Sequence, residues 1–273
     1  MEQYNTLNIT NPEQFTLLLH FTRDEIRAAA FNPLVDNSLV AATIKIDNKQ
    51  GNWLKTVENA VYDHPDLLQD YKEVKVLVDT DKFIMAPPDF NDEAIQRNSF
   101  AALFPDFDGD WLVTDMSEAQ FKVMFGVTRG FAAFLQRTFN MPPIEPTIFA
   151  IARFITRNDS DAEHARVHAH FDDNILYVTA VNNGMLLLAN TFQPRDINEA
   201  FYFISHVWDS LDLDQQHDEL FLSGDKDKRD QLLPLMRKYI ASVMPSLLPA
   251  KALKLSSDAN LVPLELIMLA LCE

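Results

Sequence analysis

Glycine is scarce in this sequence. Six of the 273 residues are glycine, about 2% of the chain, whereas about 7% is typical. A loop that holds phosphate brings backbone amides close to the ligand, and glycine permits that approach because it has no side chain. The sequence therefore offers few positions at which a phosphate-binding loop could form.

Cysteine and basic residues are also few. Cys272 is the only cysteine, which excludes an internal disulfide and a cluster of thiolate metal ligands. The chain has 23 basic and 40 acidic residues and a net charge of −17. Such a charge repels nucleic-acid backbones and anionic lipids, so we expect neither as a partner.

Long apolar runs are missing as well. The best candidate, residues 264–272, is far shorter than the roughly 20 residues that span a bilayer, and it contains Glu265. Residues 1–5 are polar and lack the basic-then-apolar order of a signal peptide. We expect no membrane span and a cytoplasmic location, which also suits the lack of disulfides.

Hydrophobic patterning predicts an α/β fold that opens with three strands, at residues 16–21, 26–31 and 39–46. A helix beginning near Trp53 and a strand at residues 74–78 are expected to follow.

The same order returns later in the chain. Strands are predicted at residues 167–171, 175–181 and 185–192, with Asn183-Gly184 forming a hairpin turn between the last two. A helix and the strand 220–222 follow. The shared order indicates an internal duplication. The polar stretch 157–163 is the candidate boundary, so we predict subdomains at residues 1–160 and 161–273.

This order of elements resembles that of the actin-like ATPase superfamily, in which two ribonuclease-H-like subdomains face each other across a nucleotide cleft. The chain is most similar to a family of Bacteroidetes proteins, a domain of unknown function with an actin-like ATPase fold. The matching features are the segments 71–78 and 186–192 and Asp196 before Tyr202, and the resemblance covers residues 17–249. A more distant resemblance is to the actin-like protein of type IV pilus assembly.

The resemblance also implies where a nucleotide would bind. In active members two strand turns hold the phosphates and a later turn receives the adenosine, each with glycine. The corresponding segments here are 20–24, 170–174 and 223–225, named the nucleotide turns below. Only the third contains a glycine, Gly224. If the cleft binds nucleotide, Thr22, Asp172 and Gly224 are the residues expected nearest the phosphates.

Two functions remain open at this point. The favoured hypothesis is a degenerate nucleotide cleft in a non-catalytic interaction or scaffold protein with an unknown protein partner. The alternative is an ATP-binding or ATP-hydrolysing enzyme, for which ATP and Mg²⁺ would be the cofactors. A metal-dependent phosphoesterase would need converging carboxylates that the strands do not supply at the expected positions.

A metal site is a weaker hypothesis. His164, His168 and His170 are close in sequence, and the last two share one face of a strand. No third ligand is fixed by the pattern, so we predict ordinary strand histidines and no catalytic or metal-binding residue.

Overall fold

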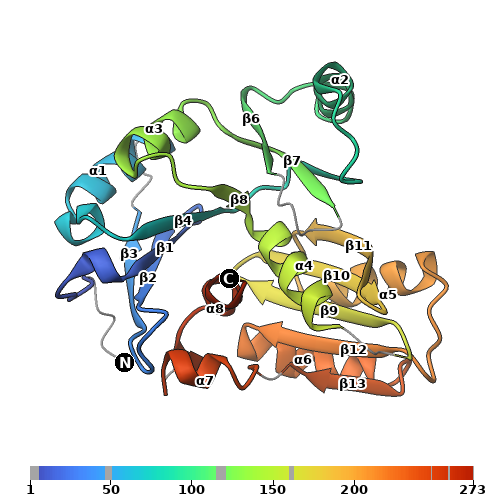
Figure 1. Ribbon diagram of the computed structural model, residues 1–273. Coiled ribbons are helices and arrows are strands. Elements are labelled where there is room, and N and C mark those ends of the chain that lie inside the picture. Colours follow the sequence, from blue (N-terminus) through green and yellow to red (C-terminus); the bar gives the residue numbers. More distant parts are fainter. Residues whose placement is uncertain are drawn as a thin grey trace. The chain divides into compact units, whose positions relative to one another are not determined.

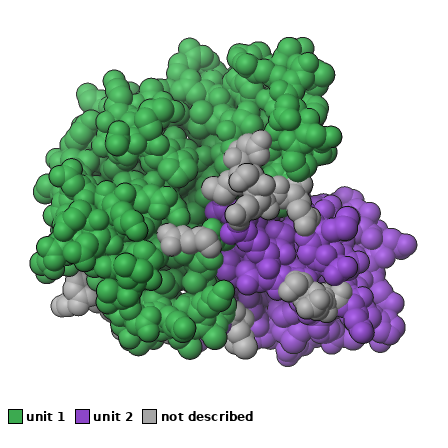
Figure 2. Space-filling model, viewed as in Figure 1, with its two compact units in different colours: residues 1–150, 249–273 green, residues 151–248 purple. Residues whose placement is uncertain are grey.

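A computed structural model describes residues 6–46, 51–114, 121–159, 163–246, 248–257 and 259–272 (Figure 1). Residues 1–5, and 160–162 within the expected boundary, lie outside the described residues. The chain forms two compact units: unit 1 comprises residues 1–150 and 249–273, and unit 2 comprises residues 151–248 (Figure 2).

The main sheet of unit 1 has five strands in the order β3-β2-β1-β4-β8. The first three strands are antiparallel neighbours, whereas β4 runs parallel to β1 and β8 parallel to β4. Their bounds are Thr16–Phe21 (β1), Glu25–Phe31 (β2), Val40–Lys45 (β3), Glu73–Val78 (β4) and Ile144–Pro146 (β8).

Burial explains why the first two strands read as continuous apolar runs. Every residue of β1 and β2 is buried, so both faces of these strands are covered. Phe131, the first residue of α3 (Phe131–Thr138), packs edge-on against Phe21 of β1 and against Trp53 of α1 (Trp53–Tyr62), at ring distances of 5.2 and 4.9 Å. The helices of unit 1 are Trp53–Tyr62 (α1), Glu93–Leu103 (α2), Phe131–Thr138 (α3), Ala252–Leu255 (α7) and Leu264–Leu271 (α8).

A smaller sheet in unit 1 has the order β5-β7-β6, with bounds Phe83–Ala86, Lys122–Thr128 and Gly109–Thr114. Phe100 of α2 and Met124 of β7 form the centre of its core. The ring of Phe107 packs against Gly109 and Gly126, and a Cβ atom on either glycine would lie 2.4 Å from that ring. These two glycines therefore make room for an aromatic side chain.

Unit 2 repeats the sheet of unit 1. Its order is β11-β10-β9-β12-β13, with β9 antiparallel to β10 and parallel to β12. The strands are Arg166–Asp172 (β9), Ile175–Asn182 (β10), Met185–Phe192 (β11), Glu219–Gly224 (β12) and Ser242–Pro245 (β13). Helices α5 (Ile197–Ser210) and α6 (Lys226–Met236) pack on one face, where Val167, Ile204 and Leu232 belong to the core. Helix α4 (Thr147–Asn158) carries the chain from unit 1 into unit 2.

The predicted duplication into two ribonuclease-H-like subdomains is confirmed. Phe21 pairs with Val78 in unit 1, and Phe171 pairs with Gly224 in unit 2. His20-Phe21 and His170-Phe171 thus occupy equivalent positions near the ends of β1 and β9. Short 3-10 helices lie at Pro12–Gln14, Pro65–Leu68 and Ala259–Leu261.

The end of the chain lies in unit 1, whereas the sequence-based division assigned all of 161–273 to the second subdomain. The N–H groups of Asn37 and Leu39 donate to the carbonyl groups of Lys254 and Leu255, at 2.8 and 3.0 Å. Helix α8 then packs against β1. Such long-range contacts leave no local mark in the sequence. Within the described residues, no helix is long and apolar enough to cross a membrane.

Candidate functional site

The first nucleotide turn joins β1 to β2 through Thr22. Its hydroxyl donates to the carbonyl of Glu25 at 3.1 Å and accepts from the N–H groups of Asp24 and Glu25 at 3.3 and 3.1 Å. Thr22 is buried. Local bonds of this kind define a turn without any ligand. A phosphate group would have to compete with them for the hydroxyl.

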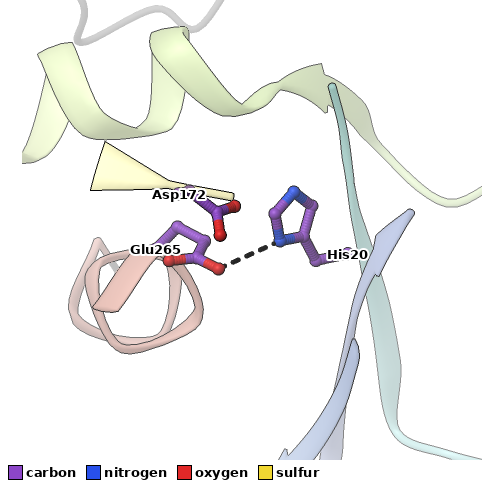
Figure 3. A group of neighbouring side chains, drawn as sticks. All are labelled: His20, Asp172 and Glu265. Atoms are coloured by element: carbon purple, nitrogen blue, oxygen red, sulfur yellow. Dashed lines mark hydrogen bonds and ion pairs between the residues drawn. The ribbon is translucent and has the colours of Figure 1, made fainter. Parts of the chain in front are cut away.

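His20, two residues earlier, is fully buried at the end of β1. Its Nε2 lies 2.7 Å from Oδ1 of Asp79, the residue that follows β4. Its Nδ1 lies 3.1 Å from Oε1 of Glu265 on α8 (Figure 3). The hydroxyl of Thr147 donates to the same Asp79 oxygen at 2.8 Å. The imidazole ring is therefore held between two carboxylates.

The two carboxylates determine the charge of His20. Burial lowers the pKa of the imidazole, but the charges and hydrogen bonds of Asp79 and Glu265 outweigh burial and raise the pKa to about 10. His20 is therefore an imidazolium at neutral pH and donates from both ring nitrogens. A protonated ring has no lone pair, so it cannot ligate a metal ion or act as a general base.

The ion pairs continue across the neighbouring strands. Arg27 of β2 donates from Nη1 to Glu265 Oε1 at 2.7 Å and from Nε to Glu25 Oε1 at 2.5 Å. Lys45 of β3 donates to the other oxygen of Glu25. Burial raises the pKa of Glu25, but hydrogen bonds from Lys45 and Arg27 outweigh it and hold the pKa below its usual value.

Charges of alternating sign therefore run through unit 1, and they define what we name the ion chain. Each member is paired with the next by a hydrogen bond or salt bridge, so the charges are compensated inside the protein. No cation of this set is left to attract a phosphate group. The members, in order, are Lys45, Glu25, Arg27, Glu265, His20 and Asp79.

The second nucleotide turn uses the equivalent positions differently. His170 of β9 is buried, and its Nδ1 lies 3.0 Å from Oγ of Ser223. Asp225 follows β12 as Asp79 follows β4. Its N–H donates to the Phe171 carbonyl at 2.9 Å, and its side chain accepts from the N–H of Lys228 at 2.9 Å. Asp225 therefore caps helix α6.

Gly224 in the third nucleotide turn is required by the neighbouring strand. Its φ is +84°, a conformation that other residues rarely adopt. A Cβ atom here would lie 1.9 Å from the carbonyl oxygen of Phe171 on β9. The contact between β9 and β12 thus accounts for this glycine without a nucleotide.

Asp172 is the last residue of β9 and pairs with Ile175 across the turn to β10. Asp173, which follows it, has a φ of +45°, and its carbonyl accepts a hydrogen bond from Lys228. Asp172 and Gly224 lie on adjacent strands of unit 2, whereas Thr22 belongs to unit 1.

The three clustered histidines do not share one environment. His168 is half-buried and stacks on Phe221 with a ring distance of 4.9 Å. Burial, aided by the charge of Arg166, lowers the pKa of His168 to about 4, so the ring is neutral at pH 7. The ring of His164 instead faces that of His217 at 5.5 Å. Taken separately, neither unit brings three His, Cys, Asp or Glu ligand atoms together among its described residues.

Sequence reasoning missed Asp79, Thr147, Arg27 and Glu265. One signal was available: Glu265 is a single charge inside an apolar run, and a buried charge requires a partner. The identity of the partner was not available, because His20 and Glu265 are 245 positions apart.

Comparison with known structures shows that the protein has an actin-like ATPase fold. A crystal structure from Bacteroides thetaiotaomicron, of a protein with actin-like ATPase fold and unknown function, is 19% identical. The match covers 98% of this chain and 100% of that chain, with a TM-score of 0.83. The structure of the PilM-PilN type IV pilus biogenesis complex matches with a TM-score of 0.58 at 12% identity, over 94% of this chain and 97% of that chain.

A comparison of the sequence with known protein families identifies the family of this chain. Residues 4–243 match the family described as "Protein of unknown function (DUF3822)", and the chain belongs to this family. The search of curated proteins found no match to this chain.

Proposed function

We propose that the protein is a non-catalytic interaction or scaffold protein whose nucleotide turns have become structural. The observation that carries this proposal is the ion chain. His20 stands at the end of β1, where an active protein of this fold presents a group to the phosphates, and it is enclosed by Asp79 and Glu265. A nucleotide phosphate would have to compete with Asp79 and Glu265 for the positive charges of His20 and Arg27, which are already paired with these carboxylates.

The remaining turns support the same conclusion. The hydroxyl of Thr22 is engaged within its own turn, and Gly224 is accounted for by its approach to Phe171. The resemblance to PilM, which is known from a complex with PilN, supports an interaction role by analogy of fold alone. The cytoplasmic location expected from the sequence stays part of this proposal.

Thermal unfolding in the presence of Mg-ATP tests the proposal. A ligand at 100 times its Kd stabilises a protein by about 2.7 kcal/mol, which raises the Tm of a chain of this size by about 5 to 10 °C. We expect no shift at millimolar Mg-ATP and no release of phosphate.

A shift that Asp172→Asn abolishes would overturn the proposal. The protein would then be an ATP-binding or ATP-hydrolysing member of the fold, with Thr22, Asp172 and Gly224 near the phosphates. A shift that Asp172→Asn leaves unchanged would also contradict the proposal, and would place the nucleotide away from the second turn.

A further inference from the structure

Unit 2 contains a pocket of about 260 Å³ between α5 and the end of α6. Its apolar lining is formed by Phe201, Trp208, Met236, Tyr239 and Ile240. Trp208, Met236 and Ile240 are buried, whereas Tyr239 is 57% exposed. The pocket thus has an apolar floor and an aromatic rim that solvent reaches.

Aromatic rings form most of this lining. The rings of Phe201 and Tyr239 lie 5.3 Å apart at an angle of 53°, and the indole of Trp208 adds a third aromatic surface. The faces of such rings carry negative electrostatic potential and attract cations. An aliphatic stem ending in a cation matches an apolar floor with aromatic walls.

The polar residues of the lining also favour a cationic ligand. Asp209 supplies an exposed carboxylate, and Ser205 and Gln215 supply neutral oxygens. Helix α5 ends at Ser210 and α6 at Met236, so both helices bring the negative ends of their dipoles near the pocket. Each of these features favours a positive charge.

Trp208 also contributes a buried hydrogen-bond donor beside the pocket. Trp208 is 3% exposed, and its indole N–H has no hydrogen-bond partner among the described residues. A buried tryptophan N–H usually has an acceptor, because burying the donor alone costs free energy. The nitrogen itself is enclosed by protein atoms, so its N–H signal reports on the packing beside the pocket.

We infer that this pocket binds a lysine or arginine residue in a segment of a protein partner. The basic side chain lies against the aromatic rings with its charge near Asp209. The volume suffices, since a cavity of roughly 150 Å³ already holds benzene. The net charge of −17 steers a basic partner toward the protein. This inference rests on the proposed interaction role and gives its partner a chemistry.

The indole N–H signals provide a direct test. The chain has 3 tryptophans, so a ¹H–¹⁵N spectrum shows three indole signals, which Trp53→Phe and Trp111→Phe assign by elimination. N-acetyl-lysine N-methylamide is titrated as the probe, and N-acetyl-norleucine N-methylamide is the neutral comparison. We expect the lysine probe to shift the Trp208 signal in a saturable way and the norleucine probe to leave it in place.

Matched variants localise the effect. Asp209→Asn and Tyr239→Leu should each weaken binding of the lysine probe by about three- to tenfold. Asp212→Asn removes an equal charge at an exposed residue outside the lining and should change nothing. The same holds for Tyr202→Leu, which alters an exposed tyrosine of α5 outside the lining.

Three results would overturn the inference: no shift of the Trp208 signal, equal binding of both probes, or equal weakening by Asp212→Asn and Asp209→Asn. The probe contains no phosphate, so such a failure leaves the Mg-ATP result unaffected. Conversely, a thermal shift with Mg-ATP would overturn the proposed function without changing the titration of Trp208.

Discussion

His20 in unit 1 and His170 in unit 2 occupy the same place in two sheets of the same strand order, yet their partners differ. His20 lies between Asp79 and Glu265, whereas His170 contacts the hydroxyl of Ser223. The difference comes partly from α8, which returns from the end of the chain to pack against β1 and brings Glu265 with it.

The aspartates after β4 and β12 show the same divergence. The backbone N–H of Asp79 donates to the carbonyl of Phe21 at 3.2 Å, and that of Asp225 donates to the carbonyl of Phe171 at 2.9 Å. The side chain of Asp79 turns to His20, and that of Asp225 caps α6. The two units thus share this backbone hydrogen bond, while the two aspartate side chains have separate structural roles.

The largest expected effect comes from exchanging the two histidines for glutamine. His20→Gln leaves the partly buried Asp79 and the buried Glu265 without a cation between them, which should cost about 3 to 5 kcal/mol of unfolding free energy. His170→Gln removes contacts of a buried ring with Ser223 and should cost about 1 to 3 kcal/mol. Urea unfolding of both variants measures the two losses, and equal losses would remove the distinction between the units.

The dependence of stability on pH should also separate the units. The folded-state pKa of His20 is raised from 6.5 to about 10, so its contribution is complete below pH 6.5 and is lost as pH rises toward 10. The folded-state pKa of His168 is lowered to about 4, so stability is lost as pH falls from 6.5 toward 4.

Unfolding free energies measured from pH 4 to 10 check both directions. His20→Gln should flatten the alkaline side of the profile and His168→Phe the acidic side. An alkaline slope that persists in His20→Gln would show that another group titrates there.

Gly224 gives a smaller but sharper comparison, because the equivalent residue of unit 1 is Val78. Gly224→Ala combines a positive φ with a clash against Phe171 and should cost about 2 to 4 kcal/mol. Gly51→Ala is the matched control, since Gly51 has a φ of +75° and, apart from its chain neighbours, no described residue has an atom within 4 Å of the added Cβ. It should cost about 1 kcal/mol. Equal costs in thermal unfolding would mean that Gly224 has no steric role.

The smallest effect is expected at the helix cap. Asp225→Ala removes the hydrogen bond from the Lys228 N–H and should cost about 1 kcal/mol. Asp79→Ala, at the equivalent position, should cost more because it leaves the buried imidazolium of His20 with one carboxylate fewer. The order of the two losses, measured in urea, decides whether the aspartates have separate roles.

Much of the fold could be predicted from the sequence because its signals are local. The hairpin at Asn183-Gly184 was predicted from residues that tolerate positive φ, and the two residues have φ values of 50° and 71°. Strands β8 and β13 were missed, because they are short and each contains a proline that weakens the strand pattern.

The candidate site was less accessible to sequence reasoning. The turns could be located by resemblance, and the scarcity of glycine was visible in the composition. The ion chain depends on pairs such as Arg27 with Glu265, which are 238 positions apart, and on the return of α8 to unit 1. Neither periodicity nor turn chemistry carries information of that kind.

The charge of His20 is the most direct test of the account. An NMR titration of the imidazole carbon and nitrogen signals, with His20→Gln for assignment, gives the pKa of this ring in the folded protein. The account predicts that His20 stays protonated through neutral pH and titrates near pH 10. A neutral ring at pH 7 would contradict the account, because the positive charge between Glu265 and Asp79 would then be missing from the ion chain.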